Sequence, residues 1–158
     1  MQPDIPAWID WLFNRPWLFV FLFVAQWALV SYVISLLGGW MELSRRFRDA
    51  GAYYSYQWPF QSVRMRTIFG SYGNCVNFGA VESGLYMAVF RPFRLGHPPL
   101  FIPWSEVQVA AHSQGLIFKS RKLFLGRQEL IPLLVRSSLA EKLQEAAGQG
   151  WPVETIAT

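Results

Sequence analysis

The sequence predicts a mainly β protein with α-helix, in which a single N-terminal transmembrane helix precedes a seven-stranded barrel or roll capped by a C-terminal helix. Three observations predict this fold class: one long uncharged apolar block, then short apolar runs between turn residues, then an amphipathic stretch with helical spacing. The expected divisions are an N-tail at residues 1–16, the membrane helix at 17–37, an amphipathic helix and aromatic linker at 38–60, the β domain at 61–148 and a tail at 149–158.

The composition and length of the apolar block predict a membrane anchor. Of 158 residues only 15% are charged, against roughly 25% in a typical soluble domain. Residues 17–37 contain no charged residue or histidine, and as a helix they would span about 30 Å, the thickness of a bilayer hydrocarbon core. A cleaved signal peptide would be shorter and would end in a small-residue cleavage site, whereas Gly38, Gly39 and Trp40 follow here. We therefore expect an uncleaved anchor and exclude disorder, a collagen-like fibre and a purely soluble domain.

Aromatic and basic residues flank this block. Indole rings favour the headgroup zone of a bilayer. The expected interfacial tryptophans are Trp8, Trp11 and Trp17 on the first side and Trp40 on the second. Trp40, Leu43 and Phe47 share one helix face, which predicts a short amphipathic helix lying on the headgroups. The juxtamembrane basic residues are Arg45, Arg46 and Arg48.

These arginines also predict the orientation. Arg15 precedes the block and three arginines follow it, so the positive-inside rule places the C-terminal domain in the cytoplasm. We expect a single-pass protein of the inner (plasma) membrane. The lone Cys75 excludes an intramolecular disulfide framework and agrees with a reducing compartment.

After the aromatic linker the chain has a β pattern, with apolar runs recurring at intervals of about 8–12 residues. The predicted strands are residues 63–69, 75–81, 84–90, 107–112, 116–119, 122–125 and 130–135, with a short extra strand at 101–104. Turns are predicted at 70–74, 82–84 and 113–115. Ser138 and Glu141 form a capping-box sequence, and Leu139 and Leu143 lie on one helix face. We expect this helix to close the barrel, with Trp104 and Leu143 in the core.

Three segments resemble bacterial pleckstrin-homology-like and GRAM-like domains. They are residues 83–87 (SGLYM), 100–107 (LFIPWSEV) and 129–133 (ELIPL). In those domains a GLYL strand, an IPW(S/D)xI strand entry and a closing helix recur, and Met87 and Val107 stand here where Leu and Ile are often found. The resemblance covers residues 63–147 and implies a seven-stranded pleckstrin-homology-like barrel. It implies no particular ligand, because a fold alone does not fix a function.

The sequence offers little that could carry catalysis. His97 and His112 lie far apart, with no cysteine or acid at metal-ligand spacing. Residues 70–73 are not a nucleophile elbow, and no glycine-rich loop leads into a helix. Cys75 beside a histidine could be a nucleophile, but a lone cysteine in an apolar strand is usually a core residue. We expect no enzymatic activity, no metal and no cofactor.

Basic residues of the β domain are the candidate contacts for an anionic lipid headgroup or a protein partner. The candidates are Arg64 and Arg66, expected on one strand face; Arg91, Arg94 and His97, in a stiff loop; and Lys119, Arg121 and Lys122, at a hairpin turn. Near an anionic leaflet each basic side chain could add up to about 1 kcal/mol of attraction. The alternative is an ordinary solvated surface.

Two classes of function remain. The first is a membrane-anchored, non-enzymatic pleckstrin-homology-like module that binds an anionic lipid headgroup or a protein partner at the cytoplasmic face. The second is a structural or assembly subunit whose membrane helix packs with other helices or with a second copy. Nucleic acid is not an expected partner, because no recognised motif accompanies the basic residues.

Overall fold

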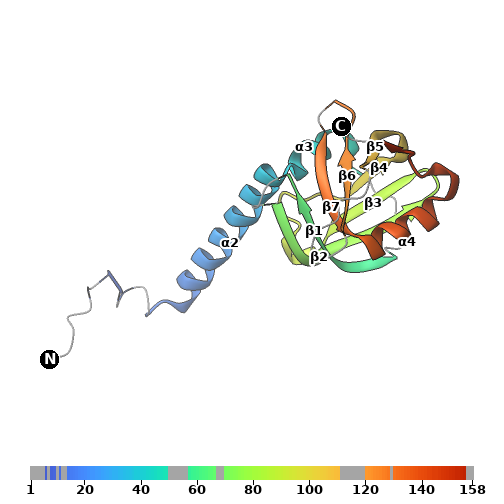
Figure 1. Cartoon of the computed structure of the whole chain (residues 1–158). Helices are drawn as coiled ribbons and strands as arrows, with labels where there is room; N and C mark the ends of the chain where they lie inside the picture. Colours follow the sequence, from blue (N-terminus) through green and yellow to red (C-terminus); the bar gives the residue numbers. More distant parts are fainter. Residues whose placement is uncertain are drawn as a thin grey trace.

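A computed structural model of the chain describes residues 6, 8–9, 11, 14–49, 57–66, 70–110, 120–128 and 130–155. Its main helices are α2 (Pro16–Gly38), α3 (Trp40–Phe47) and α4 (Ser137–Ala147). Its strands are β1 (Trp58–Met65), β2 (Gly70–Val81), β3 (Gly84–Val89), β4 (Leu100–Pro103), β5 (Val107–Ala110), β6 (Ser120–Leu125), β7 (Ile131–Arg136) and β8 (Glu154–Thr155). Three short 3-10 helices, η1 (Arg91–Phe93), η2 (Trp104–Glu106) and η3 (Gly148–Gly150), lie between them. In Figure 1, α2 projects from a barrel that the strands form.

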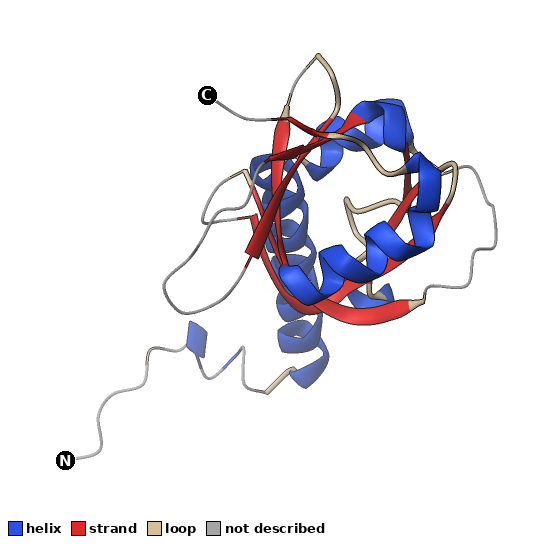
Figure 2. Ribbon diagram, turned by 45° about the vertical axis from the view of Figure 1, so that its right-hand side comes forward, coloured by secondary structure: helices blue, strands red, loops and turns tan. Residues whose placement is uncertain are grey.

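The strands form one nearly closed sheet in the order β4-β3-β2-β1-β7-β6-β5, with β8 added at the β5 edge. All neighbours are antiparallel except the two-residue β8. β1 joins the two halves because it pairs with β2 on one side and with β7 on the other. The helix α4 packs on β2, β6 and β7 and lies across the barrel in Figure 2. The predicted fold class, an apolar N-terminal helix, a seven-stranded antiparallel barrel-like sheet and a C-terminal helix, is confirmed.

The core lies between the curved sheet and α4. Alternate residues of β2 point inward, and Val76 and Phe78 are fully buried. Leu143 of α4 is also fully buried, and Trp104 is 4% exposed, so both predicted core residues are confirmed. The Trp104 indole N–H donates to the carbonyl of Val81 at 2.7 Å, which fixes η2 against the end of β2.

The largest difference from the predicted strands is in β2. Residues 70–74, predicted as a turn, are its first residues. The register of β1 against β2 shifts on either side of Gln61, and Asn74 has a φ of 48°, so the turn-forming residues lie in an irregular, bulged part of the ladder. A Cβ on Gly70 would collide with the Met65 carbonyl. The glycine is therefore needed for close approach, not for a hairpin turn.

Other boundaries differ less. β1 begins at Trp58, inside the predicted linker, and the predicted extra strand is β4. The strand predicted at 116–119 and the turn at 113–115 lie outside the described residues. The capping box is wrong, because it requires Ser138 at the N-cap, whereas the N-cap of α4 is Arg136, two residues earlier, and makes no side-chain capping bond. The Ser137 hydroxyl is buried without a hydrogen-bond partner among the described residues.

Candidate membrane-facing junction

The helix α2 has the length and composition to cross a membrane. Its 23 residues correspond to about 34 Å at 1.5 Å per residue. Only 11% of its most apolar window is buried inside the molecule, whereas the core helix of a soluble protein is mostly buried. The prediction of one N-terminal apolar helix that could span a membrane is confirmed. It ends at the predicted glycines, with Gly39 in the left-handed conformation at a φ of 84°.

The second half of α2 is packed against the barrel through one face. Its buried residues Ser31, Ser35 and Gly38 have the spacing of a single helix face. The Ser31 hydroxyl donates to the carbonyl of Leu95 at 3.2 Å, and the Ser35 hydroxyl donates to the carbonyl of Gly96. These bonds satisfy both the hydroxyls of an apolar helix and the carbonyls of the loop after η1. The helix and the barrel therefore form one packed unit.

Two glycines allow this close approach. A Cβ on Gly38 would lie 2.9 Å from the hydroxyl of Tyr72. Gly96 has a φ of 77°, and a Cβ there would lie 3.2 Å from the Cβ of Ser35. A larger residue at either position would push α2 away from the barrel.

An aromatic cluster of Trp40, Tyr72 and His97 is buried beneath the end of α2. The Tyr72 hydroxyl lies 3.0 Å from His97 Nε2, and His97 Nδ1 lies 3.0 Å from the Leu95 carbonyl. Because a carbonyl only accepts, Nδ1 carries the proton. Burial lowers the pKa of His97 and raises that of Tyr72, so both side chains are neutral and Tyr72 donates to the bare Nε2. The indole N–H of Trp40 donates to the Pro98 carbonyl at 2.9 Å.

This cluster corrects three predictions. Trp40, predicted at the headgroup interface, is fully buried, and His97, predicted to contact an anionic ligand, is 2% exposed. The apolar face of residues 40–47 exists, but Trp40 and Leu43 on it belong to the core of the barrel. The apolar face of α3 therefore packs on the barrel and is not available to the headgroups.

A cavity of about 300 Å³ lies between α2 and β2. Trp27, Val30 and Ile34 of α2 line one side, and Val89 and Phe93 line the other. Tyr72 and His97 also line it, with their polar atoms already paired as described above.

The side chain of Cys75 lines the same cavity. It is half-buried, and burial raises the pKa of its thiol. A raised pKa keeps the sulfur protonated, which is the opposite of what an activated nucleophile needs. Among the described residues, no group of three or more His, Cys, Asp or Glu side chains could hold a metal ion.

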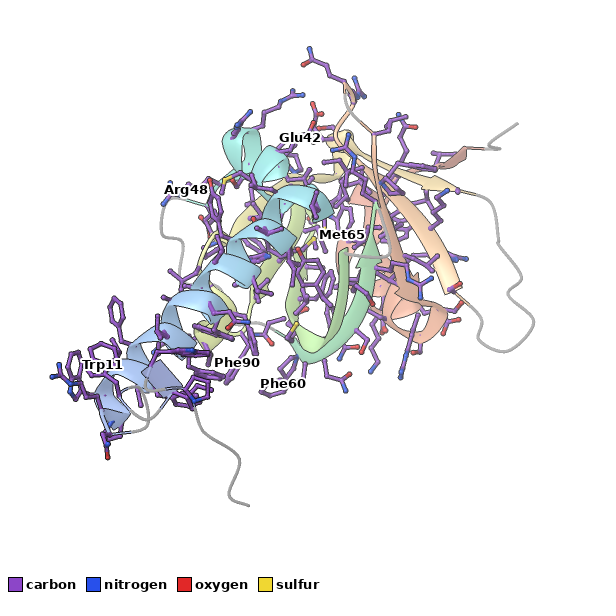
Figure 3. All side chains as sticks on the ribbon, turned by 90° about the vertical axis from the view of Figure 1, so that its left-hand side faces the viewer. Trp11, Glu42, Arg48, Phe60, Met65 and Phe90 are labelled. Atoms are coloured by element: carbon purple, nitrogen blue, oxygen red, sulfur yellow. The ribbon has the colours of Figure 1, made fainter. Side chains whose placement is uncertain are left out.

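An exposed group of apolar side chains, here called the apolar tip, adjoins this junction. It consists of Phe60, Phe90, Phe93 and Leu95, which are 39–54% exposed. The rings of Phe60 and Phe90 are 5.5 Å apart, and that of Phe93 is 5.6 Å from Trp27 of α2. Figure 3 shows Phe60 and Phe90 at the end of the barrel nearer the N-terminal half of α2, with Glu42 of α3 at the opposite end. The tip therefore continues the apolar surface of α2 onto the barrel.

Two predicted basic contacts lie beside the apolar tip. Arg91 is exposed at the start of η1, and Arg94 follows η1 and donates its Nε–H to the Val89 carbonyl at 3.3 Å. Trp8, Trp11 and Trp17 are exposed and lie toward the other end of α2.

The other predicted basic contacts are dispersed. Arg66 follows β1 with a φ of 40°, so it does not share a strand face with Arg64, and it forms an ion pair with Glu42 at 2.6 Å. Arg46 lies 3.9 Å from Glu106. With Arg45 it lines a groove of about 420 Å³ beside α3, and Arg48 forms an isolated bridge with Leu100.

The predicted basic hairpin is only partly described. Arg121 donates to Gln144 of α4 at 3.2 Å, and the Lys122 ammonium lies 4.9 Å from the centre of the Phe124 ring. Lys119 lies outside the described residues. The two described residues are thus engaged with their own domain.

Sequence reasoning missed the apolar tip and the two serines. A loop holding Phe90, Phe93 and Leu95 between strands is more apolar than a connecting loop requires. Ser31 and Ser35, four residues apart in an apolar helix, are the usual sign of a packed helix face. The apolar loop and the serine pair are both visible in the sequence, but neither shows which segment it contacts.

Comparisons with protein-family models, with curated proteins and with solved structures gave no match to this chain. The features that bear on function are therefore the junction, the apolar tip and the arginines beside it.

Proposed function

We propose that the chain is a membrane-anchored, non-enzymatic, pleckstrin-homology-like module whose barrel is held against the membrane and binds anionic lipid headgroups. The observation that carries this proposal is the apolar tip, which is continuous with the membrane helix. Two antiparallel meanders closed by a C-terminal helix support the fold part of it. The arginine excess after α2 supports a cytoplasmic barrel at the inner membrane.

The length of α2 that is free of the barrel supports contact with lipid. Residues 16–26 precede the packed face and make about 16 Å of helix, only half of a hydrocarbon core of about 30 Å. If α2 crosses the whole core, the end of the barrel beside Trp27 must enter the leaflet on its side. Exposed Phe60, Phe90 and Phe93 suit that position.

We expect Arg91 and Arg94, which flank Phe93 of the tip, to extend toward the headgroups. Long basic side chains extend their charge to the interface while their stems lie along apolar surface. Each adds about 1 kcal/mol near an anionic leaflet. The helix keeps the barrel at the membrane, so weak contacts of this kind suffice for lipid selection.

Lipid contact can be measured with a fluorophore on an introduced cysteine. In a Cys75→Ser background, the full chain carrying Phe90→Cys or Phe93→Cys is labelled and placed in vesicles whose lipids have brominated acyl chains. We expect strong quenching at both positions. The matched control is Gln128→Cys, beside Arg46 of α3 at the other end of the barrel, where little quenching is expected. Equal, weak quenching at all three positions would contradict the proposal.

Headgroup selection needs a second measurement. In nanodiscs of phosphatidylcholine and phosphatidylglycerol, the native chain should retain more phosphatidylglycerol after mild extraction than Arg91→Glu/Arg94→Glu does, and salt should reduce the difference. Arg136→Glu/Lys142→Glu changes the net charge equally at α4, which lies on the side of the barrel away from α2 in Figure 1. An equal loss in this control would assign the effect to general charge.

The assembly-subunit alternative has one observation in its favour. Leu29, Val33 and Leu36 lie on α2 away from the packed face and are 40–62% exposed. If a second membrane helix covers them, substituting all three with alanine should abolish a cross-linked complex and leave quenching at the tip unchanged. If lipid covers this surface of α2 instead, no cross-linked complex is expected.

A further inference from the structure

We infer that the cavity between α2 and β2 binds one acyl chain of a membrane phospholipid, an inference that rests on the proposed contact of the barrel with lipid. The cavity has a volume of about 300 Å³, roughly ten times the ~30 Å³ that a water molecule occupies in the liquid. That is room for a segment of one chain and too little for a folded partner.

The polar atoms in the cavity wall argue for an apolar occupant. The Tyr72 hydroxyl pairs with His97 Nε2, His97 Nδ1 pairs with the Leu95 carbonyl, and the Ser31 hydroxyl donates to the same carbonyl. A buried water needs two to four polar partners, and these groups are already satisfied by one another. The thiol of Cys75 is neutral at ordinary pH because burial raises its pKa. Ser71 adds one further hydroxyl, at an exposed position of the lining. The rest of the wall offers packing contacts to an apolar group and little to an ion or a sugar.

The position of the cavity identifies the source of that group. Its α2 wall runs from Trp27 to Ile34, about 16–27 Å from the start of a helix of about 34 Å. This is the depth of acyl chains in the leaflet nearer the barrel. Val30, Gly73 and Phe93 at its edge are exposed, whereas Tyr72 and Val89 behind them are buried. The opening therefore faces the lipid chains, and the buried side is the protein.

The bound acyl chain would exchange with the surrounding lipid. Because it moves from one apolar environment to another, its binding is favoured by van der Waals contacts in an otherwise unfilled space and not by transfer of apolar surface out of water. Detection must therefore be in the membrane and not by co-purification alone.

Photolabelling of the full chain tests the inference. The probe is a phosphatidylcholine with a diazirine midway along one acyl chain, mixed into phosphatidylcholine and phosphatidylglycerol vesicles, and adducts are mapped by mass spectrometry. We expect adducts at the buried Tyr72 and Val89 as well as at the exposed Phe90 and Phe93. Adducts at the tip without any at Tyr72 or Val89 would overturn the inference and leave the proposed function standing. No adducts at the tip would contradict both.

Filling the cavity provides the matched variants. A Cβ on Gly73 meets no atom within 4 Å, so Gly73→Leu adds bulk at the edge of the cavity without a clash at Cβ. Val30→Phe adds bulk on the α2 side. Each should reduce adducts at Tyr72 and Val89 at least several-fold and spare those at Phe90. Ser105→Leu, the same kind of addition at an exposed site on η2, should change neither. Unchanged adducts at Tyr72 and Val89 in both filled variants would overturn the inference.

Discussion

At the scale of single residues, the junction depends on polar groups that pair inside apolar surroundings. Ser31 and Ser35 are buried, and their hydroxyls donate to the carbonyls of Leu95 and Gly96. Leaving a buried hydroxyl unpaired costs about 1–3 kcal/mol. His97, two residues after Leu95 in the same loop, binds the Leu95 carbonyl, and Tyr72 of β2 binds His97. The loop that carries the apolar tip is therefore fixed by groups from both α2 and the barrel.

The neutral state of His97 predicts how stability depends on pH. Burial lowers its pKa from the ordinary 6.5, so below pH 6.5 the unfolded chain takes up a proton before the folded one does. The stability due to neutral His97 is complete above pH 6.5 and is lost as the pH falls through the lowered pKa. Urea unfolding in detergent should show this decrease, and His97→Gln should be less stable at pH 8 but less sensitive to acid. Parallel pH profiles for the two proteins would refute this role.

At the scale of secondary structure, periodicity predicted which faces are apolar but not what they pack against. Trp40, Leu43 and Phe47 predict the apolar face of α3, and the position of this helix directly after a membrane span predicts the headgroups as its partner. The barrel competes for the same face, and Trp40 is fully buried there. A single sequence cannot rank two apolar partners, because both would bury the same side chains.

The same limit applies to strands and sites. Short apolar runs between turn residues predicted β3, β5, β6 and β7 to within a few residues. The first residues of β2 were missed because Gly70 and Asn74 are turn residues by composition and are used here for close approach and a bulge. Arg91 and Arg94 were predicted as candidate contacts. Their neighbours Phe60 and Phe90 were not, because nothing local brings β1 beside η1.

The helix α4 offers a direct test of how the barrel is closed. Leu143 is fully buried in the core cluster, so Leu143→Ala should leave a cavity beneath the helix and lower the free energy of unfolding by about 2–5 kcal/mol. Glu141→Ala on an exposed part of the same helix should cost well under 1 kcal/mol. Denaturant unfolding of both variants in detergent gives the comparison. Equal losses would mean that α4 does not seal the core.

At the scale of the whole molecule, the membrane-proximal segment belongs to the folding unit. Trp40 and Leu43 belong to α3, which is not part of the sheet, and both are buried in the core. Removing a buried tryptophan side chain alone costs about 3–5 kcal/mol. A fragment of residues 39–158 should therefore unfold cooperatively by circular dichroism, whereas residues 57–158 should be markedly less stable in the same detergent. Equal unfolding midpoints would show that α3 is dispensable.

The orientation of the whole chain in the membrane is predicted by the few charges that flank α2. Arg15 precedes α2, and Arg45, Arg46 and Arg48 follow it, so the barrel should stay in the cytoplasm by the positive-inside rule. A reporter fused after Thr158 should be active only if it works in the cytoplasm. Replacing Arg45 and Arg48 with glutamine while adding two arginines next to Arg15 reverses the bias and should move part of the population to the other orientation. The Arg127→Gln variant, which changes a charge far from the span in sequence, should leave the reporter unchanged. A reporter active only outside in the native chain would place the barrel, the apolar tip and its arginines at the opposite leaflet.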